Sequence, residues 1–202
     1  MSRLKEMMPQ EAVHQRSVTM RTHPLDDERV IVEGWLRDDR LVDAFYWDGR
    51  DRPAGVVHWM CVRLLVGDWP LKILDAEAEM PGIPHELCET TKESVKKIIG
   101  LPIVAGFTER VRGLLGGVEG CAHLTYLIVA MGPAALHGYW AQRSRKRRPL
   151  PRSMEEFQGL QYLLNSCALW REEGPMVQEV RRVIEERKEG GQSPVVRSVD
   201  SP

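Results

Sequence analysis

The sequence predicts an α+β domain, a four-stranded antiparallel meander with helices packed on one face. Two observations lead to this prediction. Strand-like stretches separated by short turns follow one another between residues 29 and 80, as in consecutive antiparallel strands. Helical spacing of apolar residues replaces them after residue 84. Because strands followed by helices are typical of α+β proteins, this order indicates the fold class.

Four stretches have the composition or the alternation of strands: residues 29–37, 41–47, 55–66 and 71–80. Asp38 and Asp39 form a turn signal between the first two, which predicts a hairpin. In the third stretch His58 shares a face with apolar side chains, while Cys61 lies on the other face. The fourth alternates acidic with apolar residues, so we expect one solvated face and one core face.

Five stretches have helical spacing: residues 84–100, 108–115, 121–141, 155–170 and 175–188. Pro84 suits the first position of its helix, and Thr108 suits an N-cap. The length of 202 residues fits a single domain, expected over residues 27–189, with a flexible arm at 1–26 and a disordered tail at 190–202.

A glycine-rich turn precedes a thiol and an imidazole at residues 116–125. Gly116 and Gly117 suit the end of one helix, and Gly120 permits a further turn. Cys121 and His123 would then lie in the first turn of the next helix. A helix N-terminus lowers the pKa of a thiol and favours the metal-binding thiolate. The alternative is that Cys121 is a small buried core residue.

A metal site is the leading functional hypothesis. The candidate ligands are the thiols and the imidazole near predicted helix starts and in the C-terminal helix, with one carboxylate as an extra oxygen ligand: Cys88, Cys121, His123, Cys167 and Asp75. Three thiols and one imidazole suit Zn²⁺ or an iron–sulfur cluster. No Cys-x-x-Cys pair is present, so the fold would have to bring these residues together. Cys61 is expected to be buried and unreactive.

Two other constellations remain open. His58 could pair with Asp75 or Glu77 on the neighbouring strand, although the alternation places them on opposite faces unless a bulge intervenes. Cys121 could act as a nucleophile with His123 as its base. Side chains two residues apart in a helix diverge by about 200°, so another histidine would be needed as the base. His137 lies several turns away on the same helix, and His85 is the freer candidate.

Composition restricts the partners and the compartment. The net charge of −1 gives no overall attraction to nucleic acid or membrane. The basic stretch 141–153 lacks an aromatic stacking platform, so we favour a solvated loop over a nucleic-acid patch. No apolar run is long enough to span a bilayer and no secretory signal is evident, so we expect a cytoplasmic protein with unpaired cysteines.

A bacterial family of unknown function resembles this sequence over about residues 21–180, most specifically at 116–124, with further matching segments at 33–34, 58–60, 73–76, 84–88 and 167–169. Members of that family are often encoded beside genes for aromatic-compound degradation. A fainter similarity is to iron–sulfur cluster scaffold proteins of the IscU/NifU type, which also place cysteines at helix starts after an antiparallel sheet. Here the order of the late cysteine and histidine is reversed, and Cys167 has no counterpart.

These observations predict a metal- or iron–sulfur-binding accessory protein of bacterial metabolism. One alternative is a non-catalytic interaction subunit of a larger enzyme complex, which would bind its partner through Trp35, Trp47 and Trp59. Another is a small-molecule enzyme acting on an aromatic acid or its thioester, with Cys121 or His58 lining a pocket. The sequence does not decide between an enzyme and a binding protein.

Overall fold

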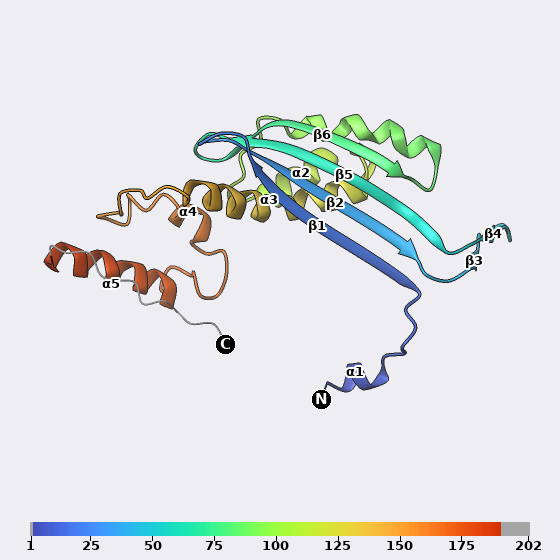
Figure 1. Ribbon diagram of the computed structural model, residues 1–202, viewed down its shortest axis with the longest axis horizontal. Helices are drawn as coiled ribbons and strands as arrows, with labels where there is room; N and C mark the ends of the chain where they lie inside the picture. Colours follow the sequence, from blue (N-terminus) through green and yellow to red (C-terminus); the bar gives the residue numbers. More distant parts are fainter. Residues whose placement is uncertain (1, 191–202) are drawn as a thin grey trace. The chain divides into compact units, whose positions relative to one another are not determined.

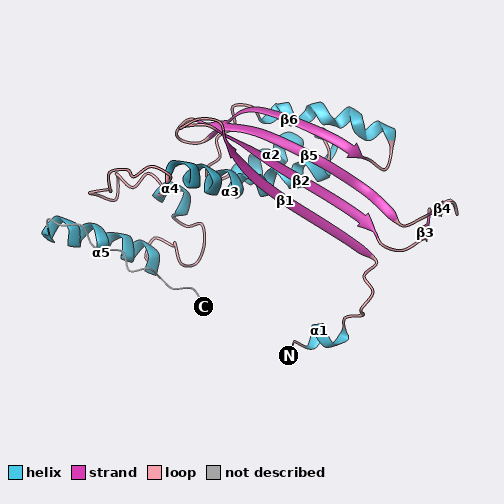
Figure 2. Ribbon diagram, in the orientation of Figure 1, coloured by secondary structure: helices cyan, strands magenta, loops and turns pink. Residues whose placement is uncertain are grey.

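The computed structural model describes residues 2–190, so all but the first residue of the predicted tail 190–202 lies outside the described residues. The chain divides into two compact units, Met1–Arg145 and Lys146–Pro202, where the sequence predicts one domain over residues 27–189. The first unit contains a sheet and its covering helices (Figures 1 and 2). Within residues 2–190, no helix has both the length and the apolar character needed to cross a membrane.

The sheet of the first unit has four antiparallel strands in the order in which they occur along the chain. These strands are β1 (His14–Pro24), β2 (Val30–Arg40), β5 (Gly55–Gly67) and β6 (Lys72–Gly82). A separate two-stranded ribbon, β3 (Ala44–Phe45) with β4 (Asp51–Arg52), interrupts the connection from β2 to β5. The predicted α+β class and the four-stranded antiparallel meander are confirmed.

The first strand of the sheet differs from the sequence expectation. Strand β1 lies within residues 1–26, predicted as a loose arm that in the structure also holds a short helix α1 (Arg3–Met7). Its partly buried Val18 and Met20 pack against the core, while polar residues between them hide the pattern of an edge strand. Strand β2 runs through the predicted turn at Asp38, because that side chain is paired across to β1.

The helices that follow β6 in the first unit cover one face of the sheet (Figure 2). They are the 3₁₀-helix η1 (Glu86–Ile98), helix α2 (Phe107–Leu115), the short η2 (Gly117–Glu119) and the long helix α3 (Ala122–Arg143). The stretch predicted as an α-helix from Pro84 is thus a 3₁₀-helix capped by His85, and α2 begins one residue before Thr108. Helix α3 packs on β1 and β2, and η1 packs on β6.

Two glycines permit the close approach of α3 to the sheet. A Cβ atom at Gly34 of β2 would lie 2.7 Å from the Sδ atom of Met131, and one at Gly138 of α3 would lie 2.1 Å from Oγ1 of Thr22. Both distances are shorter than van der Waals contact, so the α3–sheet packing depends on residues without a side chain.

The two faces of the sheet follow the predicted alternation. The face under the helices carries the buried residues of β2 and β5, such as Leu36 and Met60. The opposite face carries a charged group in which Arg63 pairs with glutamates of β2 and β6. Cys61 lies beside Arg63 and is 0% exposed, and burial raises the pKa of its thiol to about 12, so the prediction of a buried thiol is confirmed.

The second unit contains two helices among its described residues, α4 (Leu160–Leu163) and α5 (Pro175–Gly190). The predicted helix 155–170 is therefore reduced to a single turn, whereas the predicted helix 175–188 is confirmed. Cys167 follows α4 in a turn and its side chain is exposed.

Candidate metal centre

A buried carboxylate, Asp38, occupies the centre of the site. It continues the row of core-facing residues of β2 and is only 2% exposed. Arg16 lies directly opposite on β1. Its Nε and one Nη donate hydrogen bonds to the two carboxylate oxygens of Asp38, and both donor–acceptor distances are 2.7 Å. A buried charge is tolerated when it has such a bidentate partner.

The ion pair keeps Asp38 ionised. The hydrogen bond from Arg16 is the main reason why the pKa of the Asp38 carboxyl falls to about 2; burial opposes this shift, and His58 adds to it. The same bond raises the pKa of Arg16. At neutral pH the site is therefore built around a carboxylate held by a guanidinium.

His58 is the second member of the site. It lies opposite Asp38 in the pairing of β2 with β5, next to a bulge between Asp38 and Asp39. Its Nδ1 is 3.0 Å from Oδ2 of Asp38. Because the carboxylate can only accept, Nδ1 carries the proton, which leaves the lone pair of a neutral imidazole on Nε2.

The carboxylate partner of His58 differs from the one considered on sequence grounds. Asp75 lies on the exposed face of β6, where its carboxylate accepts the backbone N–H of Ala76, and Glu77 contacts Arg63 on the same face. A carboxylate does face His58, but β2 supplies it. The sequence did contain a signal for Asp38: the alternation of core-facing residues in β2 continues as far as this position. We interpreted Asp38 and Asp39 as a turn instead, so the strand was predicted to end too early.

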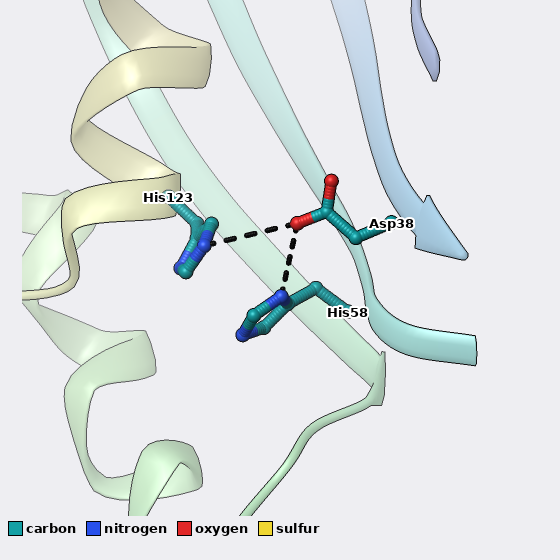
Figure 3. A group of neighbouring side chains, drawn as sticks. All are labelled: Asp38, His58 and His123. Carbon is teal, nitrogen blue, oxygen red and sulfur yellow. Dashed lines mark hydrogen bonds and ion pairs between the residues drawn. The ribbon is translucent and has the colours of Figure 1, made fainter. Parts of the chain in front are cut away.

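His123, the second residue of α3, completes the group (Figure 3). Its Nε2 is 3.8 Å from Oδ2 of Asp38, and its ring centroid is 3.8 Å from that of His58. Ligand atoms of the three residues all lie within 4.8 Å of one another, so Asp38, His58 and His123 could hold a metal ion. Among residues 2–190, they form the one such group of three or more His, Cys, Asp or Glu residues.

Cys121 lies beside this group. It is the N-cap of α3 and has extended backbone angles (φ −98°, ψ 127°), so helical geometry does not apply to it. Its Sγ is 3.9 Å from Nδ1 of His123, which corrects the expectation that the two side chains diverge. Burial raises the pKa of the Cys121 thiol, but His123 and the backbone N–H groups of Leu124 and His123 outweigh it, so the pKa is lowered.

Two further side chains border the exposed side of the ion pair. His14 places Nε2 3.5 Å from Oδ1 of Asp38, and the Arg16 guanidinium lies over the ring of Tyr126, 5.7 Å from its centroid. Neither residue was singled out from the sequence: β1, which contains His14, was interpreted as a loose arm, and Tyr126 belongs to the exposed side of α3.

The structure brings together two of the five ligands predicted from the sequence, Cys121 and His123. Cys88 lies on η1, partly buried against the core, and its backbone N–H donates to the carbonyl of His85. Asp75 is on the opposite face of the sheet, and Cys167 belongs to the second unit.

The sequence profile of a family described as "Protein of unknown function (DUF2889)" matches residues 14–137. The matched region begins at His14, runs through the sheet and includes Cys121, His123 and most of α3. Neither a curated protein nor a solved structure matches the chain.

Proposed function

The chain belongs to the family described as "Protein of unknown function (DUF2889)", and from that starting point we propose that it binds a transition-metal ion through His58, His123 and Cys121. Asp38 orients His58 in this proposal. The single observation that carries it is the grouping of two imidazoles with one ionised carboxylate, with the Cys121 thiol 3.9 Å from Nδ1 of His123.

The separation of Cys121 and His123 suits a shared ion. Tetrahedral zinc with ordinary Zn–S and Zn–N bonds would hold the two ligand atoms about 3.6 Å apart. Sγ and Nδ1 are 3.9 Å apart without any adjustment. The second nitrogen of each imidazole lies on the side away from Asp38 (Figure 3), and we propose that the ion binds on that side. A thiolate with two imidazoles suits Zn²⁺ and copper among common metals.

Asp38 is better placed to orient a ligand than to be one. Its oxygens already accept two bonds from Arg16 and one from His58. A carboxylate that accepts the N–H of a metal-binding histidine fixes the tautomer and the ring orientation. With His58, His123 and Cys121 as its protein ligands, a four-coordinate zinc ion would keep one coordination position open, as in catalytic zinc sites.

Metal content and affinity test the proposal. We expect protein loaded with Zn²⁺ and then dialysed to retain one equivalent, and Co²⁺-substituted protein to show thiolate-to-cobalt charge-transfer absorption. The variants His58→Asn, His123→Asn and Cys121→Ser should each weaken zinc binding, as measured by calorimetric titration, at least about tenfold. Full-length protein that retains no zinc and gives no cobalt–thiolate band would contradict the proposal.

The ligand set predicted from the sequence supplies the matched controls. Cys88→Ser, Cys167→Ser and Asp75→Asn remove the members of that set that lie outside the proposed centre. If the ion is held by His58, His123 and Cys121, these three variants should bind zinc like the wild type. Loss of metal in Cys88→Ser and Cys167→Ser, together with iron and sulfide in anaerobically purified protein, would favour an iron–sulfur cluster on the sequence-predicted set.

Thiol chemistry at Cys121 is a second candidate function, favoured by its lowered pKa and its contact with His123. In that case the site would be the active site of an enzyme, and His123 would accept the proton of the Cys121 thiol. Chelator treatment distinguishes the two functions. Metal binding predicts that alkylation of Cys121 is slow in zinc-loaded protein and fast after chelation, whereas a free catalytic thiol reacts equally fast in both.

A further inference from the structure

We propose that Arg16 has a second, outward-facing edge that binds the carboxylate of a small organic acid beside the metal centre. This inference names the ligand class of the proposed site and in that sense rests on the proposed function. Two observations support it. Asp38 occupies only one edge of the Arg16 guanidinium, and the side chain of Arg16 is partly exposed.

A guanidinium offers two edges, each able to donate two parallel N–H groups to an oxyanion. Asp38 occupies the edge formed by Nε and one Nη. The other edge is formed by the second N–H of that same Nη and by the remaining Nη. The shared Nη contacts Oδ2, the oxygen on which His58 and His123 converge. The second edge therefore begins next to the imidazole pair.

The side chain of Arg16 is partly exposed, as binding at this second edge requires. The side chain of Arg16 is 38% exposed although its partner Asp38 is buried. His14, whose side chain is 52% exposed, contacts Oδ1 of Asp38 at the Nε end of Arg16, away from the second edge. Tyr126 is 50% exposed and lies against the guanidinium itself, where its phenol supplies a further donor to a bound carboxylate.

The charge of the loaded site favours an anion. Arg16 and Asp38 cancel each other, and His58 and His123 would be neutral as ligands. A divalent ion with the Cys121 thiolate then leaves one net positive charge and an open coordination position. An organic acid could place its carboxylate on Arg16 and a second polar group toward the metal, and its charge would neutralise the site.

The opposite face of the sheet provides a matched control. Arg37 pairs side-on with Asp39 through Nε and one Nη, and its guanidinium lies over the ring of Trp59, 5.8 Å from the centroid. The pair reproduces the Arg16–Asp38 arrangement over an aromatic ring, but no histidine pair or thiol lies with it in a group of potential metal ligands within residues 2–190.

The test is an NMR titration of full-length protein with sodium acetate, with sodium chloride at equal ionic strength as the comparison, in zinc-loaded and in chelator-treated samples. We expect acetate to shift the side-chain signals of Arg16 and Tyr126 saturably, and Arg16→Lys to weaken this binding at least about tenfold because a lysine has no planar fork. Arg37→Lys should leave the acetate affinity unchanged. Tyr126→Phe, at an exposed position, should weaken it even if Arg16→Lys does not fold.

The outcomes separate this inference from the metal proposal. Equal shifts with chloride and acetate, or an acetate affinity unaffected by both Arg16→Lys and Tyr126→Phe, would overturn it while zinc binding could stand. Acetate binding in chelator-treated protein, in a sample that also fails to bind zinc, would support the Arg16 edge and refute the metal centre.

Discussion

The Nδ1 atom of His58 lies 3.0 Å from Oδ2 of Asp38, and the same oxygen accepts a 2.7 Å bond from Arg16. One carboxylate thereby joins β1, β2 and β5 at the place where α3 begins with His123 nearby. Asp38 thus has two roles, because the side chain that accepts a hydrogen bond from His58 also links the edge strand β1 to the sheet through Arg16. Predictions about stability and metal binding therefore converge on it.

Asp38→Asn should destabilise the fold and weaken the metal site together. An amide cannot neutralise Arg16 or hold the Nδ1 proton of His58 equally well. Because Arg16 is partly hydrated, we expect a loss of about 2 kcal/mol in the free energy of unfolding, less than for a fully buried pair. Zinc affinity should fall about 10- to 100-fold. Urea unfolding and calorimetric zinc titration measure the two effects.

Asp39→Asn is the matched control for this change. Asp39 is the next residue and also pairs with an arginine, Arg37, but on the exposed face. Exposed pairs contribute about 0–1 kcal/mol, so stability should change little and zinc affinity should not change. Equal losses in the Asp38 and Asp39 variants would refute the special role of the buried pair.

Acid should remove the contribution of Asp38 to stability. Its pKa is about 2 in the folded protein and near its ordinary value in the unfolded chain, so the unfolded state binds more protons between about pH 2 and pH 4. The contribution, about 2 kcal/mol, is complete above this range and is lost as the pH falls through it.

The difference between wild type and Asp38→Asn isolates this effect from other acidic groups. The free energy of unfolding of the variant should depend less steeply on pH between 4 and 2, as followed by urea unfolding at each pH. Parallel pH profiles would show that Asp38 is not held ionised by Arg16.

The sheet was predictable where burial follows a local period. The alternation in β5 and β6 assigned His58 to the core face and Asp75 to the exposed face, and the structure agrees. Strand β1 and the C-terminal end of β2 were not predicted. They contain the polar residues Arg16 and Asp38, which a sheet accommodates here only because the two side chains pair with each other. Such a pairing across strands is not visible in either segment alone.

The site was predictable to the extent that it lies at the start of a helix. The glycines before Cys121 correctly indicated that α3 begins there, and a helix start lowers the pKa of a thiol. The orientation of Cys121 toward His123 was not predicted, because a cap residue has extended backbone angles and does not follow the 100° helical step. The histidine partner of His123 came from a strand that only the tertiary fold brings near.

After chelator treatment, Cys121 should be the reactive thiol of the first unit, and the rate of its alkylation should depend on His123. His123→Asn removes the imidazole that favours the thiolate, so the pKa of Cys121 should rise and its alkylation by iodoacetamide should require higher pH. Cys61 should remain unlabelled in the folded protein, since burial raises its pKa to about 12. Mass spectrometry of each labelled cysteine gives the pH profiles.

Cys167 requires a separate control in that experiment. Its side chain is exposed, and backbone N–H groups of Trp170 and Leu169 lower the pKa of its thiol, so it will also be labelled. A Cys167→Ser background removes this signal. A Cys121 profile that is the same with and without His123 would show that the 3.9 Å contact does not influence the thiol.

Gly138→Ala should weaken the packing of α3 against the sheet. In a solvent-exposed helix this change stabilises by about 1 kcal/mol, but here the new Cβ would lie 2.1 Å from Oγ1 and 2.4 Å from Cβ of Thr22. Rotation of Thr22 moves its Oγ1 but not its Cβ, so the helix or β1 must shift. We expect a net loss of about 1–3 kcal/mol in urea unfolding, as for other overpacked sites.

Gly113→Ala in α2 is the control for Gly138→Ala, because a Cβ there meets nothing within 4 Å. It should stabilise by up to about 1 kcal/mol through helix propensity alone. Combining Gly138→Ala with Thr22→Gly removes the clashing atoms, so the double variant should be more stable than the sum of the two single changes predicts. Strictly additive effects would mean that α3 and β1 do not approach through Gly138. In that case the support that β1 gives Arg16, and through it Asp38, would have to come from strand pairing alone.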